Sequence, residues 1–271
     1  MICFPNAKIN LGLSITEKRD DGMHNIETCY IPIPVYDILE IIQSDSFSLV
    51  QTGVQLENNS KDNLIVKAWD LISSLKKGVK PVNVYLHKNI PVGSGLGGGS
   101  SDAAFFLTSM NNMQHLGITS DELLSIASKI GADCPFFINN KPTIATGVGN
   151  IFSPTNNPVS NMFITVIFPN FSIYTNKAFS MIIPSKGNNI LSTLNKQHSS
   201  WRNNLKNDFE EIIFSDFPEL LNIKNTLYKL GATYTSLSGS GSAIYALSKA
   251  PLNTTALGKK YSIWSETLVL D

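Results

Sequence analysis

The chain has 271 residues with 21 basic and 21 acidic side chains, and only 15% of its residues are charged. This length suits one large domain or two modest ones. A net charge of zero excludes the long-range positive field by which most nucleic-acid-binding proteins attract their partners. We therefore expect no nucleic-acid partner, and any polyanion must be held by local groups.

The sequence has no segment that predicts membrane insertion or export. No apolar run approaches the roughly 18 residues of a transmembrane helix, and the start lacks the basic and apolar regions of a signal peptide. Cys3, Cys29 and Cys134 are far apart and form no C-x-x-C pair, so they indicate neither a disulfide framework nor a zinc site. We expect a cytoplasmic protein with reduced thiols and no membrane partner.

The predicted elements mix strands and helices. Alternating apolar residues indicate strands, whereas apolar residues at a spacing of three and four indicate helices. Asp62 or Asn63 can cap one helix, and Thr119 and Glu122 form a capping box at the start of another. In chain order the prediction gives a strand over 9–15, a loop over 17–25, a strand around 38–42, a helix over 62–77, a strand over 82–86, helices over 103–116 and 119–130, short apolar runs such as 163–168, a helix near 219–230, strands over 234–237 and 243–247, and a last helix and strand to 271.

The composition of the sequence changes near residue 150, where prolines and pairs of asparagines begin to interrupt short apolar runs. We expect a boundary there, with one domain over residues 1–150 and a second over 151–271. Strands and helices without a regular βαβ alternation predict an α+β protein with two lobes.

The most informative stretch is a glycine-rich loop that ends at the start of an apolar helix. So many glycines are expected where the backbone adopts positive φ or comes close to a ligand. The unpaired N–H groups and partial positive charge of a helix N-terminus favour phosphate as that ligand. A flexible linker is the alternative, but a capped apolar helix does not normally follow a linker at once. The loop reads Pro91-Val92-Gly93-Ser94-Gly95-Leu96-Gly97-Gly98-Gly99-Ser100-Ser101.

Three other phosphate-binding loops fit this stretch less well. Gly93, Gly95 and Gly98 satisfy the dinucleotide pattern, but no acidic residue ends a second strand about 20 residues later, as ribose binding requires. A Walker A loop requires Gly-Lys followed by Ser or Thr, which is absent. A protein kinase would also carry V-A-I-K, H-R-D and D-F-G motifs, and the chain has none of them.

Two polar residues in apolar surroundings are candidates for chemistry. Lys8 interrupts an apolar strand, and Asn10 projects from the same face of that strand. Lys8 can be an exposed strand lysine, or it can line a site. Asp133 follows a helix end, and it can be a turn residue or a catalytic carboxylate. The residues alone leave both alternatives open.

Several motifs resemble those of a known superfamily. Pro-x3-Gly-Leu-Gly-Gly-Gly-Ser-Ser-Asp-Ala-Ala is similar to the ATP loop of the GHMP kinases. Together with Pro-x-Ala-Lys-Ile-Asn, Asp-Gly-x-His, Gly-Ala-Asp-x-Pro and Ser-Gly-Ser-Gly, it resembles the family of 4-diphosphocytidyl-2-C-methyl-D-erythritol kinases. The resemblance is weakest over residues 183–219. The loop over 238–242 resembles the third motif of the family, and a plain turn is its alternative.

This resemblance implies an α+β, two-lobed GHMP kinase fold with a ribosomal S5-like N-terminal domain and a ferredoxin-like C-terminal domain. It implies ATP-dependent phosphorylation of the 2-hydroxyl of 4-diphosphocytidyl-2-C-methyl-D-erythritol in non-mevalonate isoprenoid precursor synthesis. Mg²⁺ is expected with ATP, but its protein ligand is unknown. We expect only small-molecule partners and a monomer or homodimer. The alternatives are another GHMP kinase, of the homoserine or mevalonate type, and a non-catalytic nucleotide-binding homologue.

By motif position, the resemblance places the catalytic pair on Lys8 and Asp133. The carboxylate would take the proton of the attacking hydroxyl, and the ammonium would orient that carboxylate and steady the charge on the alcohol oxygen. Asn63 and Lys88 match positions near adenine and the ATP phosphates, with a helix cap and a surface charge as their alternatives. Cys134 is not a candidate nucleophile, because phosphoryl transfer to an alcohol needs no covalent step.

The resemblance also implies a binding site for the cytosine base. His24 would form a hydrogen bond with the base. Met23 stands where the family usually has a tyrosine, so only a thioether can contact the base there. Phe179 is placed where the family stacks its other aromatic ring. Asn10 and Thr175 complete the expected substrate-binding residues.

Overall fold

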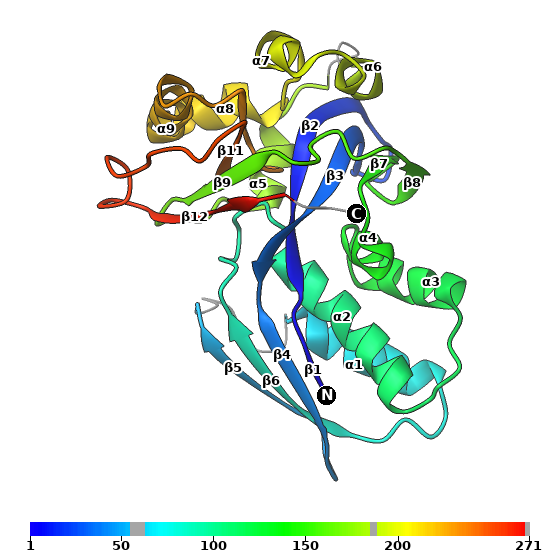
Figure 1. The fold of residues 1–271 in the computed structure, drawn as a ribbon. Helices are drawn as coiled ribbons and strands as arrows, with labels where there is room; N and C mark the ends of the chain where they lie inside the picture. The colour runs from blue at the N-terminus through cyan, green and yellow to red at the C-terminus, as the bar shows by residue number, and fades with distance from the viewer. Residues whose placement is uncertain (55–62, 185–188, 269–271) are drawn as a thin grey trace. The chain divides into compact units, whose positions relative to one another are not determined.

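The computed structural model describes residues 1–54, 63–184 and 189–268 (Figure 1). The chain forms two compact units that interleave along the sequence. Unit 1 comprises residues 1–7, 35–92 and 97–141, and unit 2 comprises residues 8–34, 93–96 and 142–271. The expected domains over 1–150 and 151–271 stay a prediction.

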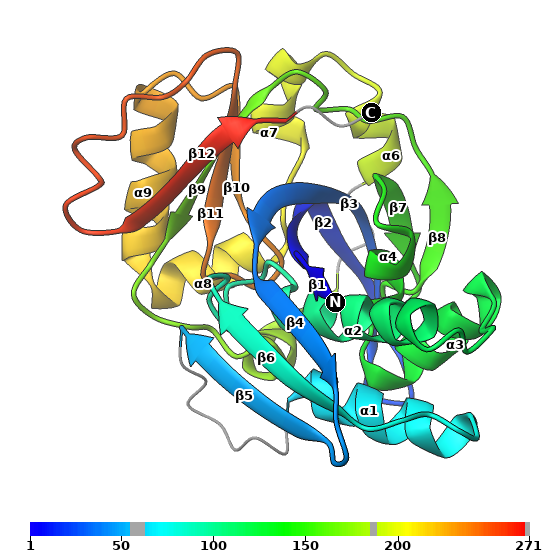
Figure 2. The same cartoon turned by 60° about the horizontal axis from the view of Figure 1, so that its bottom comes forward.

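Unit 1 is a sheet with helices against one face (Figure 2). Its elements are β1 (Ile2–Cys3), β4 (Ile38–Gln43), β5 (Ser48–Gly53), α1 (Leu64–Leu75), β6 (Val82–Lys88), α2 (Gly98–Met113), α3 (Ser120–Ile130) and α4 (Cys134–Asn139). The strand order is β1-β4-β6-β5. β4 pairs antiparallel with β1 and β6, whereas β5 pairs parallel with β6. A parallel neighbour requires a long crossover connection, and α1 lies within it.

Alternation and helical spacing build the core of unit 1. In β6 the side chains of Val84 and Leu86 are buried, whereas Tyr85 between them is exposed. α1 buries Ile65 and Ile72 on the same side, and these residues join the strand residues in one hydrophobic cluster. Burying such a side chain fully contributes about 1.5–3 kcal/mol to stability.

Unit 2 contains two further sheets. Its elements are β2 (Asn6–Lys18) and β3 (His24–Tyr36), which both also reach into unit 1, β7 (Thr143–Thr146), β8 (Ile151–Pro154), β9 (Phe163–Phe168), α5 (Thr175–Met181), α6 (Ile190–Leu194), the 3-10 turn η2 (His198–Ser200), α7 (Trp201–Asn204), α8 (Phe209–Asp216), α9 (Pro218–Lys229), β10 (Tyr234–Leu237), β11 (Ile244–Ser248) and β12 (Ser262–Thr267). The strand orders are β2-β3-β7-β8 and β10-β11-β9-β12. Neighbouring strands of the second sheet are antiparallel.

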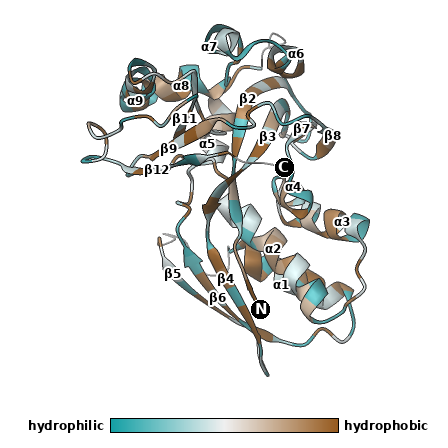
Figure 3. Cartoon of the chain, viewed as in Figure 1, coloured by the Kyte–Doolittle hydropathy of each residue, from teal (hydrophilic) through white to brown (hydrophobic). Residues whose placement is uncertain are grey.

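Helices α8 and α9 pack on the second sheet of unit 2. Figure 3 shows hydrophobic residues along β9 and a mixture of hydrophobic and hydrophilic residues on α9. The apolar side of α9 contributes Ile223 and Leu227 to a cluster that includes Ile244 and Ala246 of β11. Across the described residues, none of the helices is both long and apolar enough to cross a membrane.

Tryptophan packing differs between the units. In unit 1, Trp69 stacks on Phe47 with ring centroids 4.8 Å apart. In unit 2, Trp201 is fully buried, with its ring edge to face with Tyr234 at 5.9 Å. Trp264 of β12 is half-buried.

Most predicted elements are present. Asn63 caps α1, since its Oδ1 accepts a hydrogen bond of 2.9 Å from the N–H of Ile65. Asp62, the other predicted cap, lies outside the described residues. Thr119 and Glu122 form the predicted capping box of α3. The predicted strands over 9–15, 38–42, 82–86, 163–168, 234–237 and 243–247 correspond to β2, β4, β6, β9, β10 and β11, and the helix near 219–230 corresponds to α9.

Three expectations were wrong. The polar residues 17–25 are not wholly a loop, because β2 continues to Lys18 and β3 begins at His24. The helix expected over 103–116 begins at Gly98, so the end of the glycine-rich loop is helical. The last predicted helix is absent, since residues 251–261 form turns and irregular backbone. Pro251 and Gly258 both disfavour a helix in that segment.

Candidate active site

The second half of the glycine-rich loop is the N-terminus of α2. Gly97 caps the helix with a φ of 72°, and Gly98 and Gly99 begin it. The first backbone bond of the helix runs from the N–H of Ser101 to the carbonyl of Gly97, 2.9 Å. No side chain caps the helix at Gly97. Such a helix end suits an anion, because its first N–H groups need an acceptor.

Positions 98 and 99 are occupied by glycine for different reasons. A Cβ on Gly98 would lie 2.8 Å from Ile90 and 3.2 Å from the Nζ of Lys88, so packing requires glycine there. Of the residues that the structure describes, a Cβ on Gly99 would contact Leu64 alone, at 3.9 Å. The protein therefore has room for a side chain at position 99, and a ligand that approaches the backbone would account for glycine at this exposed position.

Lys88 lies beneath this helix end and is buried, with 2% of its side chain exposed. Its ammonium donates to Asp37 and also to Oδ2 of Asp102, 2.7 Å away. Asp37 in turn accepts backbone hydrogen bonds from Asn89 at 2.6 Å and Ile90 at 2.9 Å. The surface charge considered as the alternative for Lys88 is therefore wrong, because the side chain belongs to the interior of unit 1.

The buried cluster shifts the pKa values of its members. Burial acts to lower the pKa of Lys88, but the charges of Asp102 and Asp37 outweigh it and raise that pKa. Burial raises the pKa of Asp102 to about 7, although the charge of Lys88 acts in the opposite direction. The Oδ1 of Asp102 is buried and has no hydrogen-bond partner in the part of the chain that the structure describes, which disfavours the ionised form of this carboxyl.

Asp133 and Cys134 lie at the start of α4. Asp133 is partly exposed, and its side chain does not cap α4. Cys134 is buried, and burial raises the pKa of its thiol to about 12 although a hydrogen bond with Ser100 lowers it. A thiol with so high a pKa is a poor nucleophile, which agrees with the exclusion of Cys134.

In unit 2, Lys8 and Asn10 form a buried polar row. Lys8 is 3% exposed and Asn10 is 2% exposed, so the alternative of an exposed strand lysine is wrong. The Nζ of Lys8 donates to Oδ1 of Asn10 at 2.5 Å and lies 4.7 Å from the ring centroid of Tyr30. Asn10 donates from Nδ2 to Oγ1 of Thr28 at 3.1 Å. The backbone N–H of Lys8 donates to the carbonyl of Leu96 at 2.9 Å, which joins this row to the glycine-rich loop.

The first half of the glycine-rich loop packs on the loop over 238–242. The N–H of Ser242 donates to the carbonyl of Gly93 at 3.1 Å, and the Oγ of Ser238 donates to the carbonyl of Gly95 at 2.9 Å. A Cβ on Gly95 would lie 1.9 Å from the carbonyl oxygen of Ser238. The loop over 238–242 is thus a turn between β10 and β11 that also supports residues 93–96.

The residues expected at the cytosine base also lie in unit 2. The rings of His24 and Phe179 are stacked with centroids 5.1 Å apart, and Phe209 meets Phe179 edge to face at 4.9 Å. Among the described residues, the Nε2 of His24 is buried and has no hydrogen-bond partner. Burial lowers the pKa of His24, and the charge of Lys18 adds to this effect. The neutral imidazole can therefore offer a nitrogen to a ligand.

The other residues predicted to bind ATP or substrate lie at several positions in the structure. Met23 is exposed in the turn between β2 and β3. The Oγ1 of Thr175 lies 3.1 Å from the Oγ of Ser240, in the loop over 238–242. Asn63 acts as a helix cap and also donates to Gln51 at 3.3 Å. Pro91, Val92, Ser94, Ser100 and Ser101 belong to the glycine-rich loop, in which Ser94 and Ser101 are buried.

Sequence reasoning missed two residues that support this site. Asp37 binds Lys88 from 51 positions away, and Asn207 binds the backbone of Leu237 and Gly239, where β10 passes into the loop over 238–242. No local sequence pattern indicates either residue, because aspartate after a strand and asparagine in a loop are both common.

Family models define the class of protein. The model of the GHMP kinases N terminal domain matches residues 63–141, and that of the GHMP kinases C terminal domain matches residues 190–259. The α+β fold expected for GHMP kinases is thereby confirmed.

Similarity to curated relatives and to a solved structure identifies one family among the GHMP kinases. The chain is 43% identical over 267 residues to a 4-diphosphocytidyl-2-C-methyl-D-erythritol kinase of Parabacteroides distasonis, covering 98% of this chain and 97% of that one. It is 46% identical to a kinase of the same name from Bacteroides fragilis, covering 91% and 92%. A crystal structure of 4-(cytidine 5'-diphospho)-2C-methyl-D-erythritol kinase matches with a TM-score of 0.82, 29% identity and 98% coverage of both chains. The chain belongs to the family of 4-diphosphocytidyl-2-C-methyl-D-erythritol kinases.

More distant structures share only the fold. The mevalonate kinase of Methanococcus jannaschii matches with a TM-score of 0.71 at 13% identity, covering 99% of this chain and 98% of that one. A homoserine kinase of Cytophaga hutchinsonii matches with a TM-score of 0.63 at 15% identity, so both types are less similar to this chain than the family named above.

Proposed function

We propose that the protein transfers the γ-phosphoryl group of ATP to the 2-hydroxyl of 4-diphosphocytidyl-2-C-methyl-D-erythritol, a step of non-mevalonate isoprenoid precursor synthesis. The observation that carries this proposal is the identity of 43% to 46% with relatives named for this kinase activity over nearly the whole chain. ATP is the co-substrate that membership of the GHMP kinases implies. We further propose a cytoplasmic protein, monomeric or homodimeric.

In the proposed reaction, the 2-hydroxyl oxygen forms a bond to the γ-phosphorus of ATP. The bond from that phosphorus to the β,γ-bridging oxygen breaks, and ADP leaves with the electron pair. Asp133 takes the proton of the hydroxyl, and Lys8 steadies the negative charge on the attacking oxygen. Both roles rest on motif position, and the partial exposure of Asp133 supports access of a substrate.

The glycine-rich loop, residues 91–101, is proposed to hold the ATP phosphates. The uncapped start of α2 and the open space above Gly99 support this role. The positive charge of Lys88, which lies beneath the helix end, would act on the phosphates. Asn63 would lie near adenine. The contacts of the loop and the helix end use backbone dipoles, so they suit a chain without a net positive charge.

Mg²⁺ is proposed to accompany ATP. Within residues 1–54, 63–184 and 189–268, no group of three or more His, Cys, Asp or Glu side chains could hold a metal ion. Mg²⁺ commonly keeps several waters and binds phosphate oxygens of the nucleotide, so the ATP phosphates would supply ligands. When bound, the ion would neutralise charge on the phosphates.

His24 and Phe179 are proposed to bind the cytosine base, with Met23, Asn10 and Thr175 as further substrate contacts. The stacked rings and the unpartnered Nε2 of His24 support this assignment. A buried nitrogen without a partner is costly, and a hydrogen bond with the base would remove that cost.

The direct test is the release of ADP in the presence of Mg²⁺ and ATP with different alcohols. We expect turnover with 4-diphosphocytidyl-2-C-methyl-D-erythritol and little with the uncytidylated 2-C-methyl-D-erythritol 4-phosphate, homoserine or mevalonate. Equal rates with and without the cytidyl group would contradict the base site. Binding of ATP without turnover of any alcohol would favour a non-catalytic homologue.

A further inference from the structure

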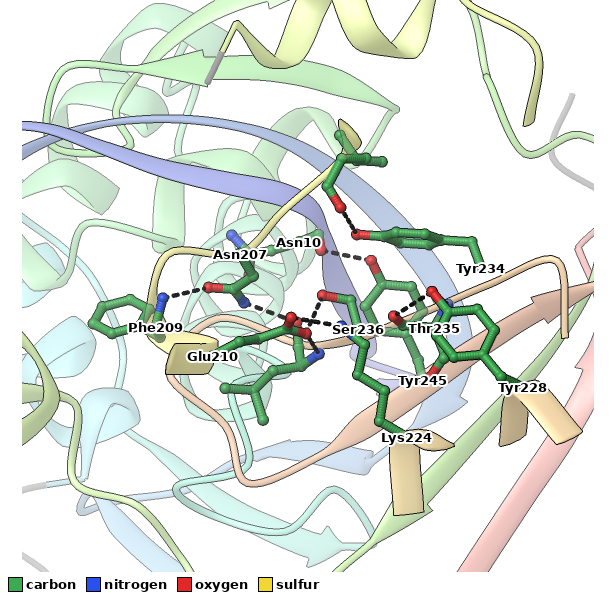
Figure 4. A network of polar contacts seen from close by, with 12 residues as sticks. Asn10, Asn207, Phe209, Glu210, Lys224, Tyr228, Tyr234, Thr235, Ser236 and Tyr245 are labelled. Carbon is green, nitrogen blue, oxygen red and sulfur yellow. Dashed lines mark hydrogen bonds and ion pairs between the residues drawn. The ribbon is translucent and has the colours of Figure 1, made fainter. Parts of the chain in front are cut away.

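Asn207 lies in the loop between α7 and α8, and both the nitrogen and the oxygen of its side-chain amide form hydrogen bonds (Figure 4). It is 3% exposed. Its Nδ2 donates two hydrogen bonds, to the carbonyls of Leu237 at 2.9 Å and Gly239 at 2.8 Å. Its Oδ1 accepts one from the N–H of Phe209 at 3.0 Å. Both donor hydrogens of the amide are therefore used to hold backbone carbonyls.

These two carbonyls flank Ser238, one of the residues that contact the glycine-rich loop, together with Ser242 and Ala243. The Oγ of Ser238 donates to the carbonyl of Gly95 at 2.9 Å and accepts from the N–H of Asn10 at 3.4 Å. The backbone of Ser238 approaches Gly95 so closely that a Cβ on Gly95 would lie 1.9 Å from its carbonyl oxygen. The bonds from Asn207 thus fix the backbone on either side of this contact.

The segment that carries Asn207 has its own anchors. The N–H of Asp208 donates to the carbonyl of Leu13 at 2.9 Å, and the Asp208 carboxylate accepts from the N–H of Ile15 at 2.7 Å. Glu210 accepts from the N–H of Leu237 at 2.9 Å and pairs with Lys224 at 2.5 Å. Figure 4 shows Glu210 among the residues of this network. Since the segment is held by other bonds, it can serve as a fixed support for the Asn207 amide.

We propose that Asn207 is a positioning residue for ATP binding. It holds the carbonyls of Leu237 and Gly239, which places Ser238, and Ser238 in turn sets the conformation of residues 93–96. This inference rests on the proposed assignment of the glycine-rich loop to ATP. Loss of the two donors would weaken the support of Ser238, although the loop over 238–242 keeps its other backbone hydrogen bonds. Small displacements of positioning groups have large effects on rate.

The first test is Asn207→Asp, which keeps the shape and the acceptor for Phe209 but replaces both donors with a carboxylate oxygen. We expect the Kd for ATP, measured by titration calorimetry, to rise by roughly tenfold, and kcat/KM for ATP to fall by roughly tenfold to a hundredfold. The matched control is Tyr228→Phe, which removes the contacts of 3.4 Å between the Tyr228 hydroxyl and the backbone of Thr235 in β10.

The control separates positioning from a general loss of stability. Tyr228→Phe should leave both ATP constants unchanged even where its unfolding temperature falls, whereas Asn207→Asp should change them well below its unfolding temperature. If the ATP constants of Asn207→Asp stay within twofold of wild type, or if both variants change them in proportion to lost stability, the inference is wrong.

The second test is a double-mutant cycle with Ser238→Ala, which removes the hydroxyl that contacts Gly95. If Asn207 acts through Ser238, the effects of the two variants on the Kd for ATP combine non-additively. Additive effects would contradict this route. A wild-type chain that binds ATP but turns over no alcohol would overturn the proposed function alone, because the cycle measures binding and needs no acceptor.

Discussion

The ammonium of Lys88 lies 2.7 Å from a carboxylate oxygen of Asp102, and neither side chain is more than 3% exposed. Asp37, which is fully buried, pairs with the same ammonium. The buried ammonium of Lys88 therefore bonds two carboxylates, one of them in the first turns of α2.

Replacement of that cation should destabilise the protein. In Lys88→Met the carboxylates of Asp37 and Asp102 remain buried without their cation, and breaking such a pair costs about 3–5 kcal/mol. Urea unfolding followed by circular dichroism measures the loss. Lys67→Met, at an exposed position of α1, is the control and should change stability by less than about 0.5 kcal/mol. Equal stability of the two variants would contradict the role of Lys88.

The pH dependence of stability should report Asp102. Its pKa is raised to about 7 in the folded protein, above an ordinary value of about 3.9. Between these values the folded state binds more protons than the unfolded state, so this group makes stability fall as pH rises towards about 7. Asp102→Asn should remove this decline. Unfolding by urea at about pH 5, 6, 7 and 8 measures it, and Asp70→Asn, at an exposed position of α1, should retain the wild-type slope.

Gly99 should show opposite effects on stability and on ATP binding. The helix has room for a methyl group there, so Gly99→Ala should keep or raise stability, by up to about 1 kcal/mol. The same methyl group should raise the KM for ATP by about tenfold or more, because it stands where phosphate is proposed to approach the backbone. Thermal unfolding and steady-state kinetics together measure the two effects. An unchanged KM for ATP would place the phosphates elsewhere.

Phe179 should affect the cytidylated substrate and leave ATP unaffected. Phe179→Leu removes the ring that stacks on His24, and we expect the KM for the cytidylated substrate to rise by about fivefold to tenfold. Phe217→Leu is the control, because Phe217 stacks on Phe171 at 5.1 Å in the same unit. It should lower stability without changing that KM. A similar KM in both variants would mean that Phe179 is only a core residue.

The proposed base can be tested by Asp133→Asn. The amide cannot accept the proton of the hydroxyl, so kcat should fall by about a hundredfold or more. Because asparagine has nearly the same shape as aspartate, the unfolding temperature and the Kd for ATP should stay close to wild type. Substantial turnover by this variant would require a different base.

Local signals explain which parts of the structure the sequence predicts well. The capping box of Thr119 and Glu122 lies within one helical turn, and the alternation of Val82, Val84 and Leu86 lies within one strand. Such signals need no knowledge of distant parts of the chain. The strand β3 was missed because Pro32 and Pro34 lie within it, and proline in a sequence argues against a strand.

Distant partners explain what the sequence could not predict. Lys88 binds Asp37 across 51 positions, and Asn207 binds Leu237 and Gly239 across 30 and 32 positions. The burial of Lys8 likewise follows from the packing around β2 and could not be read from its neighbours. The motifs identified the family, whereas the residues that support those motifs became visible only in the folded chain.

The distribution of tryptophans gives the two units separate optical reporters. Trp69 belongs to unit 1, whereas Trp201 and Trp264 belong to unit 2. Indole emission shifts to longer wavelengths when the ring enters water. In Trp264→Phe, one indole remains in each unit, stacked on Phe47 in unit 1 and fully buried in unit 2. The fluorescence of this chain can therefore distinguish whether its two units melt together or one after the other.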